Sequence, residues 1–213
     1  MRNYLTLVLM ILAALTFGCA DPAANKPKAT VGNAQSESNS SKSAAAEKLI
    51  ISPENSKVEF VAAKVTRSHD GSFKQFAGTI DLVPNNIPGS RVTIEIDTKS
   101  VVTDTDDLTK HLQTPDFFDV AKYPKATFVS TKIEPASAGG GTHTIAGNFD
   151  LHGVKKSITF PATIQVAADS VMVNAEFSIN RKDFGIVYAG KADDLIRDGV
   201  VIKLTVKAPR AQP

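Results

Sequence analysis

The stretch Arg91-Val92-Thr93-Ile94-Glu95-Ile96-Asp97 alternates apolar and polar residues without a break. Successive side chains of a β-strand point to opposite faces, so Val92, Ile94 and Ile96 would share one dry face. The same period of two recurs between residues 57 and 207 far more often than the helical period of 3.6. The pattern therefore predicts an all-β domain.

Eight segments carry this alternation. They are 57–65, 72–83, 91–97, 126–133, 143–151, 158–166, 171–179 and 200–207. Turn residues separate several of them, at His69-Asp70-Gly71, Pro84 to Gly89, Gly139-Gly140-Gly141 and His152-Gly153. Short links favour antiparallel neighbours. Eight such strands form either two stacked sheets or a closed barrel, and periodicity alone leaves both open.

One long interruption, residues 100–125, breaks the period of two. Within it, Thr103 or Asp104 is placed to cap a short helix, near residues 103–112, that reaches His111 or Leu112. Phe117 and Phe118 follow in the same interruption. They close one end of a barrel interior, form part of its wall, or pack as a small core beneath the loop, and the sequence does not choose among these.

The N-terminal region has the features of an exported protein. An apolar run of about eleven residues, Leu5 to Leu15, is too short for the ~20 that a spanning helix needs, so we expect a signal peptide at 1–18 instead of a transmembrane anchor. The single cysteine, Cys19, follows in an imperfect lipobox and is the expected lipid attachment site. The residue after the cysteine is Ala20 and not the aspartate that favours retention in the inner membrane. We therefore expect the outer membrane. We therefore expect a periplasmic, membrane-anchored lipoprotein.

The rest of the chain divides by composition. Residues 19–48 are mostly small and polar and are expected to form a flexible, lipid-anchored linker. Residues 49–208 have the size of one domain, and 209–213 form a short tail. The formal net charge is +2, from 24 basic and 22 acidic residues, which supplies no basic stripe for a phosphate backbone. Nucleic acid is therefore not an expected partner.

A resemblance to a known family rests on four strings. They are NSKVEF (55–60), HLQTPDFFDVAKYPKATF (111–128), GNFDLHGVKK (147–156) and FSINRKDFGI (177–186). In this order they resemble the YceI-like family of lipocalin-like, polyisoprenoid-binding proteins of the bacterial periplasm. Many members carry an Arg-Asp pair just before the second string, whereas residues 105–110 here contain no arginine. A head-group contact made by that arginine is therefore not carried over.

The resemblance implies an eight-stranded antiparallel lipocalin-like barrel that holds a long isoprenoid chain, such as a quinone tail or a polyprenyl lipid. Burying such a hydrocarbon gains about 25 cal/mol per Å² removed from water. The predicted apolar lining consists of Phe60, Phe76, Ile94, Phe117, Phe118, Phe128, Phe149, Phe160, Val173, Phe177 and Ile202. The alternative is a solid core without a cavity, as in a plain interaction domain of the cell envelope.

Polar residues suggest contacts at the mouth of such a barrel. The candidate head-group contacts are His69, His143 and Arg181. The planar fork of Arg181 suits phosphate or quinone oxygens, but a structural brace with Asp183 is the commoner role for such a pair.

No catalytic residue, cofactor or metal is predicted, because no histidine or cysteine pair has the spacing of zinc ligands. The sequence thus favours non-catalytic binding, storage or transport of an isoprenoid lipid. An isomerase or hydrolase acting on an apolar substrate on the same scaffold is the second hypothesis.

Overall fold

The computed structural model of the protein describes residues 20–36, 46–136 and 140–210. The signal peptide expected at 1–18 and the lipid attachment site expected at Cys19 lie outside these residues. The first strands are β1 (Thr30–Asn33), β2 (Glu47–Ile51), β3 (Lys57–Ala63), β4 (Ser68–Phe73), β5 (Phe76–Leu82), β6 (Arg91–Asp97) and β7 (Val101–Thr103). The later strands are β8 (Lys125–Pro135), β9 (His143–Leu151), β10 (Val154–Val166), β11 (Ser170–Asn180), β12 (Gly190–Lys191), β13 (Asp194–Leu195) and β14 (Gly199–Pro209).

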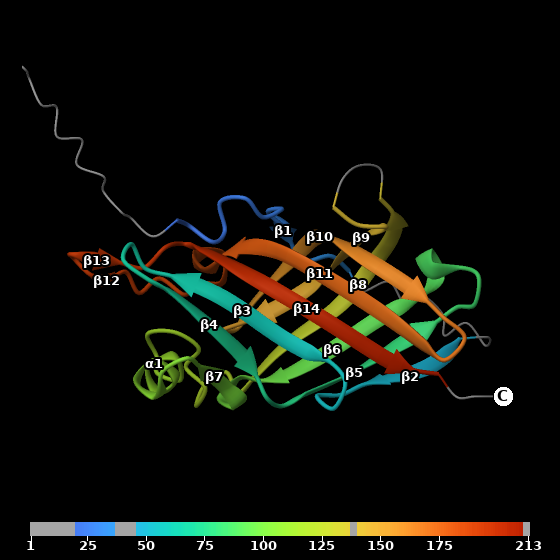
Figure 1. Cartoon of the computed structure of the whole chain (residues 1–213), viewed down its shortest axis with the longest axis horizontal. Helices are drawn as coiled ribbons and strands as arrows, with labels where there is room; N and C mark the ends of the chain where they lie inside the picture. Colours follow the sequence, from blue (N-terminus) through green and yellow to red (C-terminus); the bar gives the residue numbers. More distant parts are fainter. Residues whose placement is uncertain (1–19, 37–45, 137–139, 211–213) are drawn as a thin grey trace, which may run out of the picture.

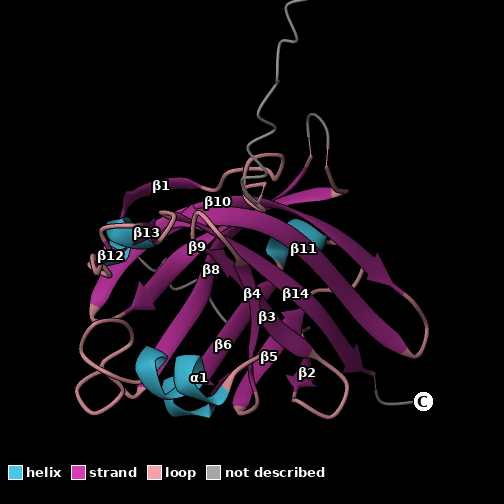
Figure 2. Ribbon diagram, turned by 60° about the vertical axis from the view of Figure 1, so that its left-hand side comes forward, coloured by secondary structure: helices cyan, strands magenta, loops and turns pink. Residues whose placement is uncertain are grey.

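Four helical segments complete the described fold. They are α1 (Asp106–Leu112) and the 3-10 turns at Ile87–Gly89, Thr98–Ser100 and Arg181–Phe184. Helix α1 and the small β12–β13 hairpin lie at the same end of the strongly curved sheet (Figures 1 and 2). Within the described residues, no helix is long and apolar enough to cross a membrane.

The strands form an antiparallel barrel. Their pairing order is β2-β5-β6-β8-β9-β10-β11-β14-β3-β4-β7 (Figure 1). The order begins on β2, which leads along the chain into β3, and it ends on β7, which follows β6 along the chain. The β3–β4 hairpin continues into the β2–β5 pairing, and the β5–β6 hairpin continues into the β4–β7 pairing. Thus β2–β3, β4–β5 and β6–β7 are three bent strands, and β14 closes the ring by pairing with β3. This confirms the predicted antiparallel lipocalin-like barrel. Its sheet has twelve strands, which become the expected eight when each bent strand is counted once and β1 is left out.

The bends explain why periodicity alone misplaced some features. Phe73 and Phe76 flank the bend between β4 and β5, and both face inward although three positions separate them. The turn predicted at His69-Asp70-Gly71 is wrong, because these residues lie within β4 and pair with β3. Gly71 is needed there for a close approach: a Cβ atom would lie 2.1 Å from the Phe60 ring.

The structure confirms two further local predictions, a turn and a short helix, but corrects the N-cap of the helix. The turn between β9 and β10 is confirmed, with His152 at φ 55° and Gly153 at φ 73°. The short helix is confirmed and ends at Leu112, but its N-cap is Thr105 and not Thr103 or Asp104. Those two side chains are engaged elsewhere: Thr103 Oγ1 donates to the Thr105 carbonyl, and Asp104 bonds His69.

The N-terminal segment is folded against the barrel. Strand β1 pairs antiparallel with β10, and Ala29 beside it is 3% exposed. The prediction of a flexible linker over 19–48 is therefore wrong for residues 20–36, and β2 already begins at Glu47. The composition argument failed because this segment is held mainly by main-chain hydrogen bonds to existing strands, which require few apolar side chains.

Candidate ligand-binding cavities

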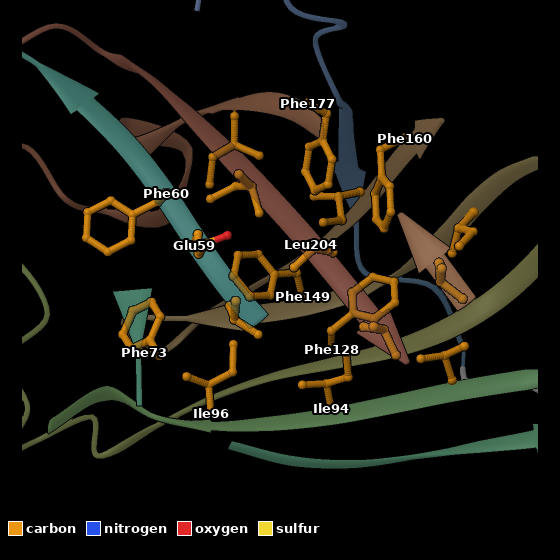
Figure 3. Close-up of a pocket in the computed structure, with 18 of the residues that line it drawn as sticks. Glu59, Phe60, Phe73, Ile94, Ile96, Phe128, Phe149, Phe160, Phe177 and Leu204 are labelled. Atoms are coloured by element: carbon orange, nitrogen blue, oxygen red, sulfur yellow. The ribbon is translucent and has the colours of Figure 1, made fainter. Parts of the chain in front are cut away.

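The inward faces of the barrel strands enclose an apolar cavity of about 100 Å³, cavity 1 (Figure 3). It is lined by Val58, Glu59, Phe60, Phe73, Ile80, Val92, Ile94, Ile96, Phe128, Ile145, Phe149, Ile158, Phe160, Val173, Phe177, Ile179, Ile202, Leu204 and Val206. These residues share the inward parity of their strands, Glu59 excepted, and all but Glu59 are aliphatic or phenyl. The alternation predicted from sequence is thus what gives the cavity its apolar wall.

A second cavity of about 100 Å³, cavity 2, adjoins the first toward the α1 end of the barrel. The two share Phe60, Phe73, Ile96, Phe149, Ile179 and Ile202. Cavity 2 is completed by Ala62, Leu112, Phe117, Phe118, Ala126, Leu151, Arg181, Ile186, Ile196 and Val200. A chain that occupies both cavities must pass the shared rings of Phe60, Phe73 and Phe149.

Ring contacts fix the wall of cavity 1. Phe160 and Phe177 stack with centroids 4.1 Å apart and ring planes only 13° from parallel. Phe128 lies against Phe160 at 5.7 Å, with its ring tilted by 54°. These residues come from the neighbouring strands β10 and β11 and from β8, two strands away in the pairing order, so their contacts hold this part of the wall together. Figure 3 shows the stacked pair on one side of the cavity and Phe60 and Phe73 on the other.

The two phenylalanines of the long loop close cavity 2. The Phe118 ring lies 5.6 Å from Phe73 and 6.5 Å from Phe60, both nearly edge-on. Phe117 is buried beneath His111 and Tyr188, with centroids 4.9 Å and 5.4 Å away. Both rings therefore form part of the cavity wall, and they are continuous with the main core.

The structure places the residues of the predicted lining around these cavities. Every predicted lining residue except Phe76 borders one or both cavities, and Phe76 is buried in the core beside them. The residues missed were mostly aliphatic neighbours of the same parity, such as Ile96 and Ile179, which the alternation already placed inward. Ile186 and Ile196 had no such signal, because they lie in a loop without a period of two.

Arg181 borders cavity 2 with its charge already engaged. The side chain is 5% exposed. Its Nη1 donates to the Ile186 carbonyl at 2.8 Å, its Nε to the Arg197 carbonyl at 3.1 Å, and its Nη2 to the Asp198 carboxylate at 3.3 Å. Burial lowers the pKa of Arg181, and the charge of Asp198 opposes this shift. The guanidinium thus braces the loop that follows β11, with Asp198 in place of the expected Asp183.

The two histidines proposed as head-group contacts lie apart from Arg181 and from each other. His69 Nδ1 is 2.8 Å from Asp104 Oδ1, and this hydrogen bond is the main cause that lowers the pKa of Asp104. His143 lies at the start of β9, whose other end, at Leu151, borders cavity 2. It lines a separate surface depression with Leu82 and Pro84, among others. The structure therefore does not bring the three residues into one site.

The cavities are small as they stand. Small-molecule pockets commonly measure about 300–1,000 Å³, and a cavity of about 150 Å³ accepts one benzene. Each cavity therefore accepts on the order of one five-carbon branched unit, and a longer chain requires the side chains between and around them to move. Among the described residues, no group of three or more His, Cys, Asp or Glu is placed to hold a metal ion.

Comparisons with known proteins agree with this geometry. The model of the YceI-like domain family matches residues 50–208. A UPF0312 protein of Pseudomonas putida (strain W619) is 34% identical, and Protein YceI of Salmonella arizonae is 36% identical, each over 122 residues. These matches cover 54% of this chain and 62% of each relative, so the chain spans somewhat less than two thirds of their length.

Solved structures share the fold. BcnA of Burkholderia cenocepacia superposes with a TM-score of 0.66 at 24% identity, covering 74% of this chain and 99% of that one. A polyisoprenoid binding domain from Saccharophagus degradans gives 0.61 at 20% identity, covering 78% and 99%. The Campylobacter jejuni YCEI protein gives 0.54 at 25% identity, covering 67% and 85%. The barrel is therefore common to these proteins despite low sequence identity.

Proposed function

The chain belongs to the YceI-like domain family, and from this premise we propose that its barrel binds an isoprenoid lipid, of quinone or polyprenyl type, without changing it chemically. The observation that carries the proposal is the pair of adjoining cavities whose walls are aliphatic and phenyl apart from Glu59 and Arg181. A similar fold is described as a polyisoprenoid binding domain in Saccharophagus degradans.

The chemistry of the wall favours a branched hydrocarbon. An isoprenoid carries no polar group along its chain, so it leaves no hydrogen-bonding group unsatisfied inside such a cavity. Its methyl branches can pack against phenyl and isoleucine side chains, and each Å² buried contributes about 25 cal/mol. The polar head would remain at the cavity 2 end, where Arg181 is the one charged residue among those that line that cavity.

The placement of two histidine–aspartate pairs supports binding over catalysis. His69 pairs with Asp104, and His111 Nε2 lies 2.9 Å from Asp116 Oδ2. Neither histidine is among the residues that line cavity 1 or cavity 2. A general acid or base must reach the reacting atom within about 3 Å, so these pairs are poorly placed for chemistry on a bound hydrocarbon.

We propose that the protein lies in the periplasm, where a lipid on Cys19 anchors it to the outer membrane. The described chain begins at the α1 end of the barrel: Asp21 lies 3.8 Å from Arg197, and Ala23 packs beside Gly199. An anchor at Cys19 would therefore hold the cavity 2 end near the membrane. Labelling with radioactive palmitate tests this, since the label should enter the natural chain and be absent from Cys19→Ser.

The lipid proposal is tested by purifying the protein from its own host and analysing an organic extract by mass spectrometry. We expect an isoprenoid at a stoichiometry that approaches one per chain. The matched control is Val173→Lys, which places a charge in the wall of cavity 1 and should carry none. An extract of the natural chain that repeatedly lacks isoprenoids would overturn the proposal.

A further inference from the structure

Strands β10 and β11 separate along part of the barrel wall. They pair with each other over residues 163–166 and 171–174. From there β11 continues to Asn180 along β14, while the other half of β10 continues along β9. Over that stretch, neither strand supplies the other with main-chain hydrogen bonds. The barrel's own eight strands therefore leave a gap here, which we call the β10–β11 gap.

The N-terminal segment fills this gap. On one side, Thr30 to Asn33 pair antiparallel with β10 over residues 156–159. On the other side, the Ala29 amide donates to the Ser178 carbonyl at 2.8 Å, and the Ser178 amide donates to the Pro27 carbonyl at 2.8 Å. Residues 27–33 are thus an inserted strand that satisfies main-chain groups of both neighbours, and β1 is seen beside β10 in Figure 1.

The ligand cavity lies directly behind this insert. Ile158 and Phe160 of β10 and Phe177 and Ile179 of β11 all line cavity 1. Ala29 belongs to the same hydrophobic core, and the partly buried Val31 packs against it. Removal of the insert would therefore expose the stacked Phe160–Phe177 pair and the cavity behind it through the side of the barrel.

The insert is held more weakly than the strands around it. Strand β1 has four residues, and a Cβ atom at Gly32 would meet open space. Its further ties lie near the protein surface. They are the ion pairs Lys26–Glu176 at 2.9 Å and Asp21–Arg197 at 3.8 Å, two hydrogen bonds of 2.8 Å between the Gln35 main chain and the Asn148 side chain, and one of 3.2 Å from Thr131 Oγ1 to Gln35 Oε1. Segments with few buried apolar contacts open locally at a lower free energy than core strands.

The α1 end of the barrel offers a harder route. Phe117, Phe118, Ile186 and Ile196 close the α1 end of cavity 2, and Arg181 braces the loop that carries the last two. Opening that end means breaking a packed aromatic cluster and a buried set of hydrogen bonds. Moving residues 27–33 breaks a single short strand that lies outside the matched family domain, residues 50–208.

We propose that the β10–β11 gap is a lateral entry port for the isoprenoid and that residues 27–33 of the same chain are its gate. This inference rests on the proposed function, because it assigns the path by which that ligand reaches cavity 1. The gate lies at the side of the barrel and is not expected to contact the head group of the lipid. It controls the rate at which the hydrocarbon enters and leaves, and it should affect the affinity far less.

A reversible cross-link tests the gate. Thr30 and Thr159 are directly opposed on β1 and β10, so Thr30→Cys with Thr159→Cys can form a disulfide that locks the insert. The matched control, Asn174→Cys with Thr205→Cys, links opposed, exposed positions of β11 and β14 that take no part in holding the insert. Both are made in the full chain with Cys19→Ser, which removes the one natural thiol. The probe is tritiated geranylgeraniol, released from the protein into excess phosphatidylcholine vesicles.

We expect the oxidised gate variant to release and take up geranylgeraniol about tenfold more slowly than its reduced form, with a nearly unchanged affinity. Dithiothreitol should restore the rate, and the control disulfide should leave it unchanged. An oxidised gate variant that exchanges the probe as fast as its reduced form would overturn the port while leaving the proposed function standing. If the uncross-linked chain binds no geranylgeraniol, the proposed function and the port both fail.

Discussion

Strands β11 and β1 are neighbours in the barrel wall, yet they are specified in opposite ways. β11 spans eleven residues, alternates regularly, and buries Val173, Phe177 and Ile179 on its inner face. β1 spans four residues, and its one large apolar side chain, Val31, is only partly buried. The first strand carries its own reason to be a strand. The second is a strand because β10 and β11 leave main-chain groups that it can satisfy.

The comparison predicts different costs for similar damage. A change on the inner face of β11 acts on the whole cooperative core, so it should lower the free energy of unfolding of the barrel. A change in β1 can cost no more than the free energy with which residues 20–36 dock, because the segment can detach while the barrel stays folded. The following four changes test this difference, from the largest expected effect to the smallest.

Val173→Lys should have the largest effect. Val173 is 8% exposed and lines cavity 1, so the new ammonium would be buried without a partner. We expect a loss of about 4 kcal/mol in the free energy of unfolding, measured with urea. Lys203→Gln on the outer face of β14 is the control and should change it by less than about 0.5 kcal/mol. Equal losses in both variants would contradict the inward and outward assignments.

Ala29→Asp places a charge at the most buried point of the inserted segment, where the natural side chain is 3% exposed. We expect the free energy with which residues 20–36 dock on the barrel to fall by about 2 kcal/mol, because this segment can detach while the barrel stays folded. Hydrogen exchange of the Ser178 amide reports it directly, since that amide donates to the Pro27 carbonyl.

In Ala29→Asp, the Ser178 amide should lose protection while the amides of β8 and β9 keep theirs. Gly32→Ala is the matched control in the same strand, because its Cβ would meet open space. It should preserve protection at Ser178. Global loss of protection in Ala29→Asp would show that the insert and the barrel unfold as one unit.

Asn148→Ala removes the polar tie at the end of the inserted segment. Asn148 is 1% exposed on β9, and its amide both accepts from and donates to the Gln35 main chain. Because solvent can reach the released Gln35 groups, we expect a loss of about 1 kcal/mol in urea unfolding. Ser178 should lose less protection than in Ala29→Asp. A cost equal to that of Val173→Lys would mean that this tie belongs to the barrel core.

Asp104→Asn should have the smallest effect, and it should depend on pH. The hydrogen bond from His69, followed by the charges of His69 and Arg67, lowers the pKa of Asp104 below its usual 3.8. A lowered carboxyl pKa stabilises the fold above the unfolded-state pKa, and this contribution is lost as the pH falls through the folded value.

We therefore expect the free energies of unfolding of wild type and Asp104→Asn to differ by about 0.5 kcal/mol at pH 7, because the pair is partly exposed, and to differ by less at pH 3. Chemical unfolding at the two pH values measures this. A difference that grows toward pH 3 would contradict the assigned direction.

The alternation of side chains predicted the strands, and the family resemblance favoured a barrel over two stacked sheets. The alternation of Val92, Ile94 and Ile96, and of the equivalent positions on the other strands, placed most of the cavity wall. It missed β1, because a strand held by main-chain hydrogen bonds leaves no period in its own residues. It also missed Phe73, since the bend between β4 and β5 breaks the parity that would have paired it with Phe60.

The polar part of the site was harder to predict for a related reason. Arg181 was placed correctly near the barrel end, but the partner chosen for it was Asp183, two positions away. The observed partners are Asp198 and the carbonyls of Ile186 and Arg197, which only the tertiary fold of the loop after β11 brings to it. A buried guanidinium group must be hydrogen-bonded, and the carbonyls that accept from it are brought close only by the tertiary fold. Sequence spacing therefore does not predict which carbonyls they are.

The central claim is that a hydrocarbon lies inside the barrel, against the stacked rings of Phe160 and Phe177. Nuclear Overhauser contacts between geranylgeraniol and the ring protons of the ¹³C-labelled protein test it most directly. We expect contacts from the methyl branches to Phe160, Phe177 and Phe149, and none to the exposed Val187 or Ile50. Contacts confined to those exposed residues, or none to any ring of cavity 1, would contradict it.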